Sequence, residues 1–273
     1  MITSTSNQQM KNLSALLKKS KERARQQCFV VEGTKMCLEA PVERVQAIYV
    51  AEAYWQQEEL RRGLLEYCSK REGLERCCEV VSDSVFKAVS DTQTPQGILS
   101  VVRMPEYRLS DCLAGKRTLL LILESIQDPG NLGTMLRTGE GAGITGIIAN
   151  RTTVDLYNPK TIRSTMGSIY RVPFVVADDL ADTIRLLKEQ GITLYAAHLQ
   201  GKLSYDRPNY TQGCGFFIGN EGNGLSDEIA GLADEYIRIP MEGQVESLNA
   251  AISASLLTYE CNRQRRYMNE NLV

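Results

Sequence analysis

The second half of the chain alternates short apolar runs with segments of helical periodicity. Six apolar runs follow residue 116, in the order TLLLILE, TGIIA, PFVVA, ITLYAAH, GFFIG and YIRIP. Such runs are typical of strands buried on both faces, as in parallel sheets covered by helices. The sequence therefore predicts an α/β fold with a mainly parallel sheet, whose ligands bind at the carboxyl ends of the strands. Helices are predicted from about 132, near 158–167, and at 179–190, 225–233 and 247–263.

The first 105 residues form a smaller α/β pattern of their own. Residues 10–27 predict one amphipathic helix, and FVVEGTKMCLEA then predicts a strand, a glycine turn and a helix. At 273 residues the chain exceeds the usual size of one compact domain. We therefore predict a domain at 1–105, a linker at 106–116 and a second domain at 117–273.

Positive charge is concentrated near the N-terminus, although the whole chain has a net charge of -2. Residues 1–35 contain seven cations against the carboxylates of Glu22 and Glu32, a balance of +5. A basic face of this kind can follow the phosphates of a nucleic acid, and a solvated helix is the alternative. The candidate RNA-binding residues are Lys18, Lys19, Lys21, Arg23, Arg25 and Lys35.

Several classes of site are disfavoured. The eight cysteines form no CxxC pair and His198 is the only histidine, so we expect no metal site. The longest apolar run, at 119–123, is far too short to cross a bilayer, and the first residues lack the apolar core of a signal peptide. We therefore expect a cytoplasmic protein without a membrane partner.

The first chemically unusual segment follows the strand predicted near residue 120. Asp128, Pro129 and Gly130 predict a turn, after which Asn131 is placed to cap a helix. Arg137 follows six residues later, roughly 9 Å along a helix axis, so that both side chains can flank one nucleotide. The alternative is that Asn131 is only a cap and Arg137 only a surface cation.

The second segment is a glycine-rich loop that follows the apolar run GFFIG. Its residues, from Gly219 to Gly224, favour positive φ and leave main-chain groups open to a ligand. Glu221 is the only ionisable group in this loop. The alternative is a tight strand-to-helix turn without a ligand.

The third segment leads into the last helix. Pro240 ends a strand, Ser247 is predicted to cap the helix, and Asn249 is predicted to lie in its first turn. Small residues at 250–255 permit the close approach of another backbone, either within the domain or in an interface between subunits.

Taken together, these segments resemble motifs 1, 2 and 3 of the SpoU (TrmH) branch of the SPOUT methyltransferases. The matching patterns are N-x-G-x-x-x-R-T at 131–138, I-G-N-E-G-x-G at 218–224 and I-P-M-x-G-x-x-x-S-L-N at 239–249. The resemblance covers about 117–262, and residues 1–105 resemble the ribosomal-protein-like RNA-binding domain that many members carry.

The resemblance implies a C-terminal trefoil knot, a feature so rare that only the family supports it. It also implies S-adenosyl-L-methionine as cofactor and a homodimer with the active site near the subunit contact. The implied cofactor-binding residues are Leu199, Gly219, Asn220, Glu221, Ile239, Met241 and Leu248. The implied catalytic residues are Asn131, Arg137, Glu221, Ser247 and Asn249.

The activity that the resemblance implies is methyl transfer to a ribose 2'-hydroxyl of RNA, with ribosomal RNA favoured by the additional N-terminal domain. Transfer RNA as substrate, and a non-catalytic RNA-binding protein of the same fold, are the alternatives. In the family the arginine is held to activate the hydroxyl. Because a guanidinium stays protonated, we expect Arg137 instead to stabilise the developing alkoxide, while Ser247, Asn249 or water relays the proton.

Overall fold

The computed structural model describes residues 1–115, 117–198 and 200–270, and it divides into two compact units. Unit 1 comprises Met1–Glu106 together with Asp155–Tyr170, and unit 2 comprises Tyr107–Val154 and the chain from Arg171 onward. The sequence-based division kept 155–170 with the residues that flank it, whereas this segment packs with the N-terminal residues. No described helix has both the length and the apolar character needed to cross a membrane.

Unit 1 is built on a four-stranded sheet in the order β1-β4-β2-β3. The strand β4 runs antiparallel to β1 and β2, and β3 is parallel to β2. The strands are β1 (Cys28–Glu32), β2 (Val45–Ala51), β3 (Cys78–Val81) and β4 (Ile98–Arg103). The helices are α1 (Gln8–Lys18), α2 (Ser20–Gln26), α3 (Thr34–Glu39), α4 (Glu52–Gln56), α5 (Glu58–Cys68), α6 (Asp83–Val89) and α9 (Pro159–Thr165), with short 3-10 turns at Val42–Arg44, Leu74–Cys77 and Ser168–Tyr170.

The helix predicted at 10–27 is in fact two helices. Lys19 takes an extended conformation, with φ -123° and ψ 112°, and separates α1 from α2. The apolar side of α1 is buried as its spacing predicts, through Met10, Leu13, Leu16 and Leu17. The prediction of one continuous helix was wrong, because the periodicity of α1 does not reveal where the basic segment turns away.

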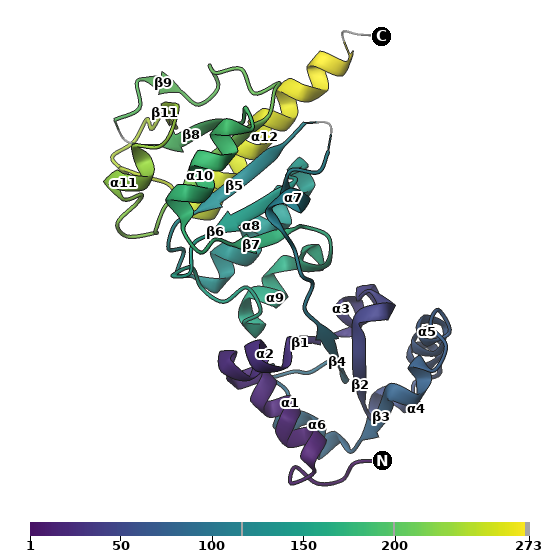
Figure 1. Ribbon diagram of the computed structural model, residues 1–273. Helices are drawn as coiled ribbons and strands as arrows, with labels where there is room; N and C mark the ends of the chain where they lie inside the picture. The colour runs from purple at the N-terminus through teal and green to yellow at the C-terminus, as the bar shows by residue number, and fades with distance from the viewer. Residues whose placement is uncertain (116, 199, 271–273) are drawn as a thin grey trace. The chain divides into compact units, whose positions relative to one another are not determined.

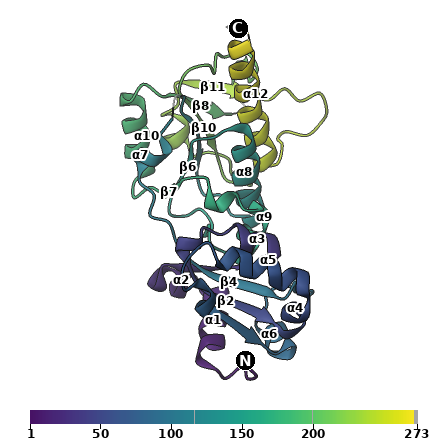
Figure 2. The same cartoon turned by 90° about the vertical axis from the view of Figure 1, so that its right-hand side faces the viewer.

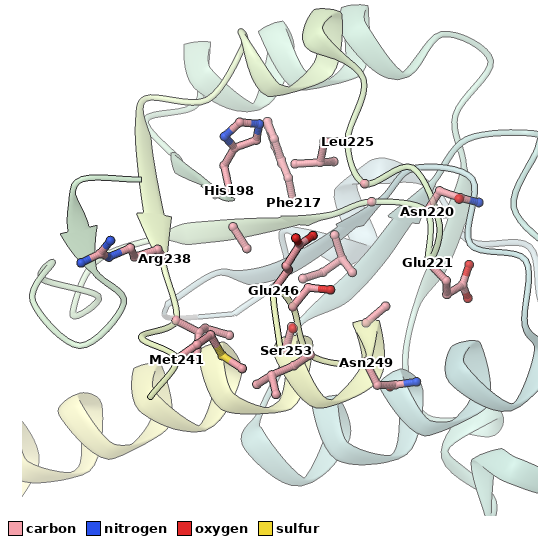
Figure 3. A pocket seen from close by; sticks show the side chains of 18 of the residues that line it. His198, Phe217, Asn220, Glu221, Leu225, Arg238, Met241, Glu246, Asn249 and Ser253 are labelled. Carbon is pink, nitrogen blue, oxygen red and sulfur yellow. The ribbon is translucent and has the colours of Figure 1, made fainter. Parts of the chain in front are cut away.

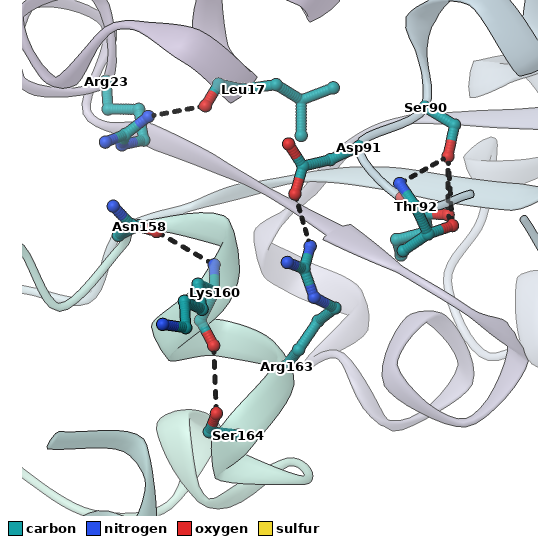
Figure 4. A network of polar contacts seen from close by, with 10 residues as sticks. Leu17, Arg23, Ser90, Asp91, Thr92, Asn158, Lys160, Arg163 and Ser164 are labelled. Carbon is teal, nitrogen blue, oxygen red and sulfur yellow. Dashed lines mark hydrogen bonds and ion pairs between the residues drawn. The ribbon is translucent and has the colours of Figure 1, made fainter. Parts of the chain in front are cut away.

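The segment Asp155–Tyr170 is held in unit 1 by polar and aromatic contacts. Arg23 donates to Asp155 over 2.6 Å and to the carbonyl of Leu17 over 3.2 Å, and Arg163 pairs with Asp91 over 2.5 Å (Figure 4). The ring of Tyr157 lies 4.8 Å from that of Phe29. These contacts explain why the segment belongs to the N-terminal unit.

Unit 2 contains a seven-stranded sheet in the order β7-β6-β5-β10-β8-β11-β9, in which every neighbouring pair is parallel. The strands are β5 (Leu119–Leu123), β6 (Gly146–Ala149), β7 (Phe174–Val176), β8 (Thr193–Ala197), β9 (Leu203–Ser204), β10 (Cys214–Ile218) and β11 (Glu235–Arg238). The helices are α7 (Leu109–Cys112), α8 (Pro129–Ala142), α10 (Leu180–Glu189), α11 (Asp227–Ala230) and α12 (Ala250–Glu270). The prediction of an α/β fold with a mainly parallel sheet is confirmed.

Helices cover both faces of this sheet. Figure 2 shows α7 and α10 on one face and α8 and α12 on the other; in Figure 1, which is turned by 90°, these helices overlap the strands. The central strands β5 and β10 are buried along their whole length. Because the strands are parallel, the loops that follow β5, β10 and β11 emerge at one edge of the sheet. This topology brings three segments that are distant in the sequence into one region.

Candidate active site

A cavity of about 970 Å³ lies at the carboxyl ends of the strands of unit 2 (Figure 3). Its walls come from the loops after β8, β10 and β11 and from the start of α12. A volume of this size is in the range of small-molecule sites, and position at the ends of parallel strands is the usual one for α/β sheets. The cavity is therefore the candidate ligand site of unit 2.

Glu221 receives three hydrogen bonds from the segment that follows β5. The main-chain N–H groups of Gln127 and Asp128 donate to its two carboxylate oxygens over 3.0 and 3.1 Å. Asn131 donates from Nδ2 to Glu221 Oε1 over 2.9 Å. One carboxylate of the loop after β10 thus makes three hydrogen bonds to the segment after β5.

The surroundings of Glu221 favour its ionised form. Partial burial raises the pKa of Glu221, but the hydrogen bonds from Asn131, Gln127 and Asp128 together outweigh it and leave the pKa below its usual value. At neutral pH the Glu221 carboxylate therefore only accepts hydrogen bonds. The Asn131 amide must then point its NH₂ group, and not its oxygen, toward Glu221.

Asn249 brings the third segment to the same place. Its Nδ2 donates to Asn131 Oδ1 over 2.9 Å, and its Oδ1 accepts from the N–H groups of Ala251 and Ile252 over 2.9 and 3.3 Å. Asn249 is thus the residue that caps α12, and the prediction that Ser247 caps it was wrong. The first motif differs in the same way, because Asp128 rather than Asn131 caps α8.

The glycine-rich loop is a closed turn. Asn220 and Gly224 exchange two main-chain hydrogen bonds of 3.0 and 2.9 Å, and Asn220 Oδ1 accepts from the N–H groups of Gly222 and Asn223. A Cβ atom at position 219 would lie 2.2 Å from the carbonyl carbon of Gly224. Gly219 is therefore required by the close approach of the two ends of this turn.

Most of the predicted cofactor-binding residues line the cavity. They are Gly219, Asn220, Glu221, Ile239, Met241 and Leu248, and Leu199 lies outside the described residues. The cavity is also lined by residues that the sequence did not single out, among them His198, Phe217, Leu225, Arg238 and Glu246. Their positions at the carboxyl ends of β10 and β11, or in the segments that follow β8, β10 and β11, are the only sequence signal that could have indicated them.

The remaining predicted catalytic residues differ in their placement. Ser247 and Asn249 line the cavity, whereas Asn131 reaches it only through its bonds to Glu221 and Asn249. Arg137 lies on the exposed surface of α8, six residues beyond Asn131. Within the described part of the chain its guanidinium has no ion pair, which leaves it available to an external anion.

The predicted RNA-binding residues of unit 1 are exposed with one exception. Lys18, Lys19 and Lys21 face solvent, and the exposed Arg25 and Lys35 pair with Glu22 and Glu39 over 2.7 and 3.8 Å. Arg23 is only 4% exposed. We remove it from the set, because its guanidinium is committed to Asp155 and to carbonyls of α1.

Neither the thiols nor the acidic groups indicate a metal centre. All eight cysteines are free, and burial raises the pKa of the Cys112 thiol to about 12. Over residues 1–115, 117–198 and 200–270, no three His, Cys, Asp or Glu side chains form a group able to hold an ion.

Comparison with known proteins identifies the family. The model of the SpoU rRNA Methylase family matches residues 118–259, and that of the MRM3-like substrate binding domain matches residues 7–100. The chain belongs to the SpoU rRNA methylase family. The match spans all three segments that meet around Glu221.

Individual members of the SpoU family are similar over nearly the whole chain. A 23S rRNA (guanosine(2553)-2'-O)-methyltransferase of Bacillus subtilis is 35% identical, covering 94% of this chain and 97% of the relative. The SpoU methyltransferase AviRb from Streptomyces viridochromogenes is 26% identical and superposes with a TM-score of 0.83. The match covers 96% of this chain and 99% of the AviRb chain. An AdoMet-bound rRNA methyltransferase from Sinorhizobium meliloti is 29% identical and superposes with a TM-score of 0.81. The match covers 96% of this chain and 97% of that methyltransferase.

Proposed function

We propose that the protein transfers a methyl group from S-adenosylmethionine to a ribose 2'-hydroxyl of RNA. The observation that carries the proposal is the hydrogen-bonded chain Glu221–Asn131–Asn249, which joins the three family motifs beside one cavity. The Bacillus subtilis relative is a ribosomal RNA 2'-O-methyltransferase by name. The relative from Sinorhizobium meliloti was solved with AdoMet.

The lining of the cavity fits this methyl donor. Main-chain groups around Gly219 and Ile239 would hold the polar parts of the donor, and the partly exposed apolar side chains of Met241 and Leu248 would contact its apolar parts. Carboxylates at Glu221, Glu242 and Glu246 complement a ligand that carries positive charge. When bound, S-adenosylmethionine supplies a methyl group on a sulfonium centre that an oxygen can displace.

The polar chain aligns the acceptor hydroxyl. Ionised Glu221 orients Asn131 and Asn131 orients Asn249, whose other end is held by the main-chain N–H groups of Ala251 and Ile252. Fixing the reacting groups in this way can supply much of the acceleration of a displacement reaction. Water accepts the proton of the hydroxyl, directly or through a relay by the Ser247 hydroxyl, because both ends of the Asn249 amide are already engaged.

Arg137 acts as an electrostatic clamp. Its exposed guanidinium lies on the same helix as Asn131. A permanently charged fork stabilises both a developing alkoxide and an adjacent phosphate of the RNA backbone.

Ribosomal RNA is the favoured substrate, with transfer RNA as the alternative. Residues 7–100 match a substrate binding domain, and the exposed Lys18, Lys19 and Lys21 are suited to the phosphates of that RNA. We further propose that the chain is a cytoplasmic homodimer with a trefoil knot at its C-terminal end. Ile252 and Tyr259, which are 49% and 48% exposed on α12, support a subunit contact there.

A methylation assay tests the proposal. The protein is incubated with labelled S-adenosylmethionine and either 23S ribosomal RNA or transfer RNA, both transcribed in vitro and therefore unmodified. We expect label at one nucleotide of the ribosomal RNA, whose 3' bond then resists alkaline cleavage. Label in transfer RNA alone would correct the substrate. The non-catalytic alternative would be favoured by two results together: the protein binds RNA without transferring labelled methyl groups to it, and calorimetric titration shows no binding of S-adenosylhomocysteine.

A further inference from the structure

The loop that follows β6 makes a contact with every residue from Ser125 to Gln127, in the segment that carries the first motif. Ser125 has φ +56°, one of three positive values at non-glycine residues in the described chain. A left-handed conformation is unfavourable for a serine, so the surrounding structure must hold it.

Asn150 holds Ser125 with both ends of its amide. Asn150 Oδ1 accepts from the N–H of Ser125 over 2.9 Å, and Asn150 Nδ2 donates to Ser125 Oγ over 3.1 Å. Thr152 adds a hydroxyl contact of 2.6 Å to the same Oγ. On the other side, Asn220 of the glycine-rich loop donates to the carbonyl of Ser125 over 2.8 Å.

The next residues are held by the same loop. The N–H of Val154 donates to the carbonyl of Ile126 over 2.8 Å, and Gln127 Nε2 donates to the carbonyl of Thr152 over 2.9 Å. Gln127 then presents its own N–H to Glu221. The direction of this N–H, and that of Asp128 beside it, follows from the conformation of Ser125.

Asn150 and Thr152 do not line the cavity. Among the described residues, no hydrogen bond joins either side chain to the lining of the cavity, to Asn131 or to Asn249, so the effect we infer passes through 125–128. Loss of Asn150 would remove two of the hydrogen bonds that hold Ser125, two residues before the N–H group that Gln127 donates to Glu221.

We propose that Asn150 is a positioning residue. It fixes the segment 125–128, and this segment holds Glu221 and Asn131 in the orientation that aligns the acceptor hydroxyl. The inference rests on the proposed function. It predicts that changes at Asn150 lower the rate of the methyl-transfer step and leave donor affinity nearly unchanged.

Three variants of the full chain test this role. Asn150→Ala removes both bonds to Ser125, whereas Asn150→Asp keeps an acceptor for the N–H of Ser125. Thr153→Val is the matched control, because the Thr153 hydroxyl donates over 2.9 Å to Asn150 and to none of the residues 125–128. Single-turnover rates are measured at saturating 23S ribosomal RNA transcript, and donor affinity is measured by titration with S-adenosylhomocysteine.

We expect Asn150→Ala to lose about 10- to 100-fold in rate, since small misplacements of reacting groups cost this much. Asn150→Asp should recover most of that loss, and Thr153→Val should match the unchanged protein, with equal donor affinity in all. Equal rates in Asn150→Ala and Thr153→Val would overturn the inference, as would a parallel loss of donor affinity. If Asn150→Ala does not fold, a rate for Asn150→Asp below that of Thr153→Val supports the inference and equality overturns it. Absence of methylation by the unchanged protein would instead refute the proposed function.

Discussion

Asn249 donates a hydrogen bond to Asn131 over 2.9 Å, although 118 residues separate them in the sequence. The same Asn249 side chain caps α12 through its other end. One amide thus serves both the start of a helix and the polar chain that leads to Glu221. Its two roles can be separated by substitution.

Asn249→Asp and Asn249→Ala should differ in stability and agree in activity. Asp keeps the oxygen that caps α12, so we expect little change in the unfolding free energy, whereas Ala should lose about 1 kcal/mol. Both lose the bond to Asn131 and should lose on the order of 100-fold in methylation rate. Denaturant unfolding and single-turnover rates give the comparison, and a fully active Asn249→Asp would show that the Asn131 contact is dispensable.

Glu221 should make stability depend on pH. Since its pKa is lower in the folded chain than when unfolded, its stabilising contribution is present above the unfolded pKa, about 4.3, and is lost as pH falls through the lower folded pKa. Glu221→Gln removes this part of the acid dependence. Unfolding curves measured from neutral to acidic pH should therefore converge for the two proteins at low pH, and parallel curves would contradict the pKa shift.

Arg137→Lys should keep the fold and lose activity. The guanidinium has no ion pair within the described residues, so we expect an unchanged unfolding midpoint. The lysine retains charge without the planar fork, and we expect about a 10- to 100-fold lower rate with an unchanged pH profile. A new ionisation in the pH–rate profile of the variant would instead indicate that the residue at this position exchanges the proton.

The ion pair of Arg23 and Asp155 should stabilise unit 1. The Arg23 side chain is 5% exposed and that of Asp155 32%, so Arg23→Met leaves a partly buried carboxylate without its partner, at an expected cost of about 2–3 kcal/mol. Arg25→Met is the matched control. The Arg25 side chain is 69% exposed in the pair with Glu22, where water and salt screen the attraction, so we expect this variant to lose clearly less stability than Arg23→Met. Equal unfolding free energies for the two variants would show that Arg23 has no anchoring role.

The parallel sheet and the meeting of the three motifs could be predicted from the sequence because they depend on repeated local patterns. The strands of unit 2 read as apolar runs, and parallel topology then places their carboxyl ends together. The break at Lys19 and the inclusion of 155–170 in unit 1 could not be predicted. They depend on contacts such as Arg23 with Asp155, which are separated by 132 residues.

Within the site, the sequence indicated which residues lie together, but not which of them caps a helix and which bonds to another motif. Ser247 and Asn249 are both common capping residues, and only the geometry distinguishes them. The contribution of Asn150 had no signal at all, since the positive φ of Ser125 is imposed by tertiary contacts. Polar residues in loops that lack a motif are therefore the part of such a site that sequence reasoning misses.

Hydrogen exchange of the full chain, with and without S-adenosylhomocysteine, tests most directly whether the cavity is the donor site. We predict slower exchange of main-chain amides in the loop that starts at Gly219 and in the segment from Ile239 to Ala250, and no change in α1 to α6. Protection confined to other parts of the chain, or no protection at a saturating concentration of the ligand, would contradict the account.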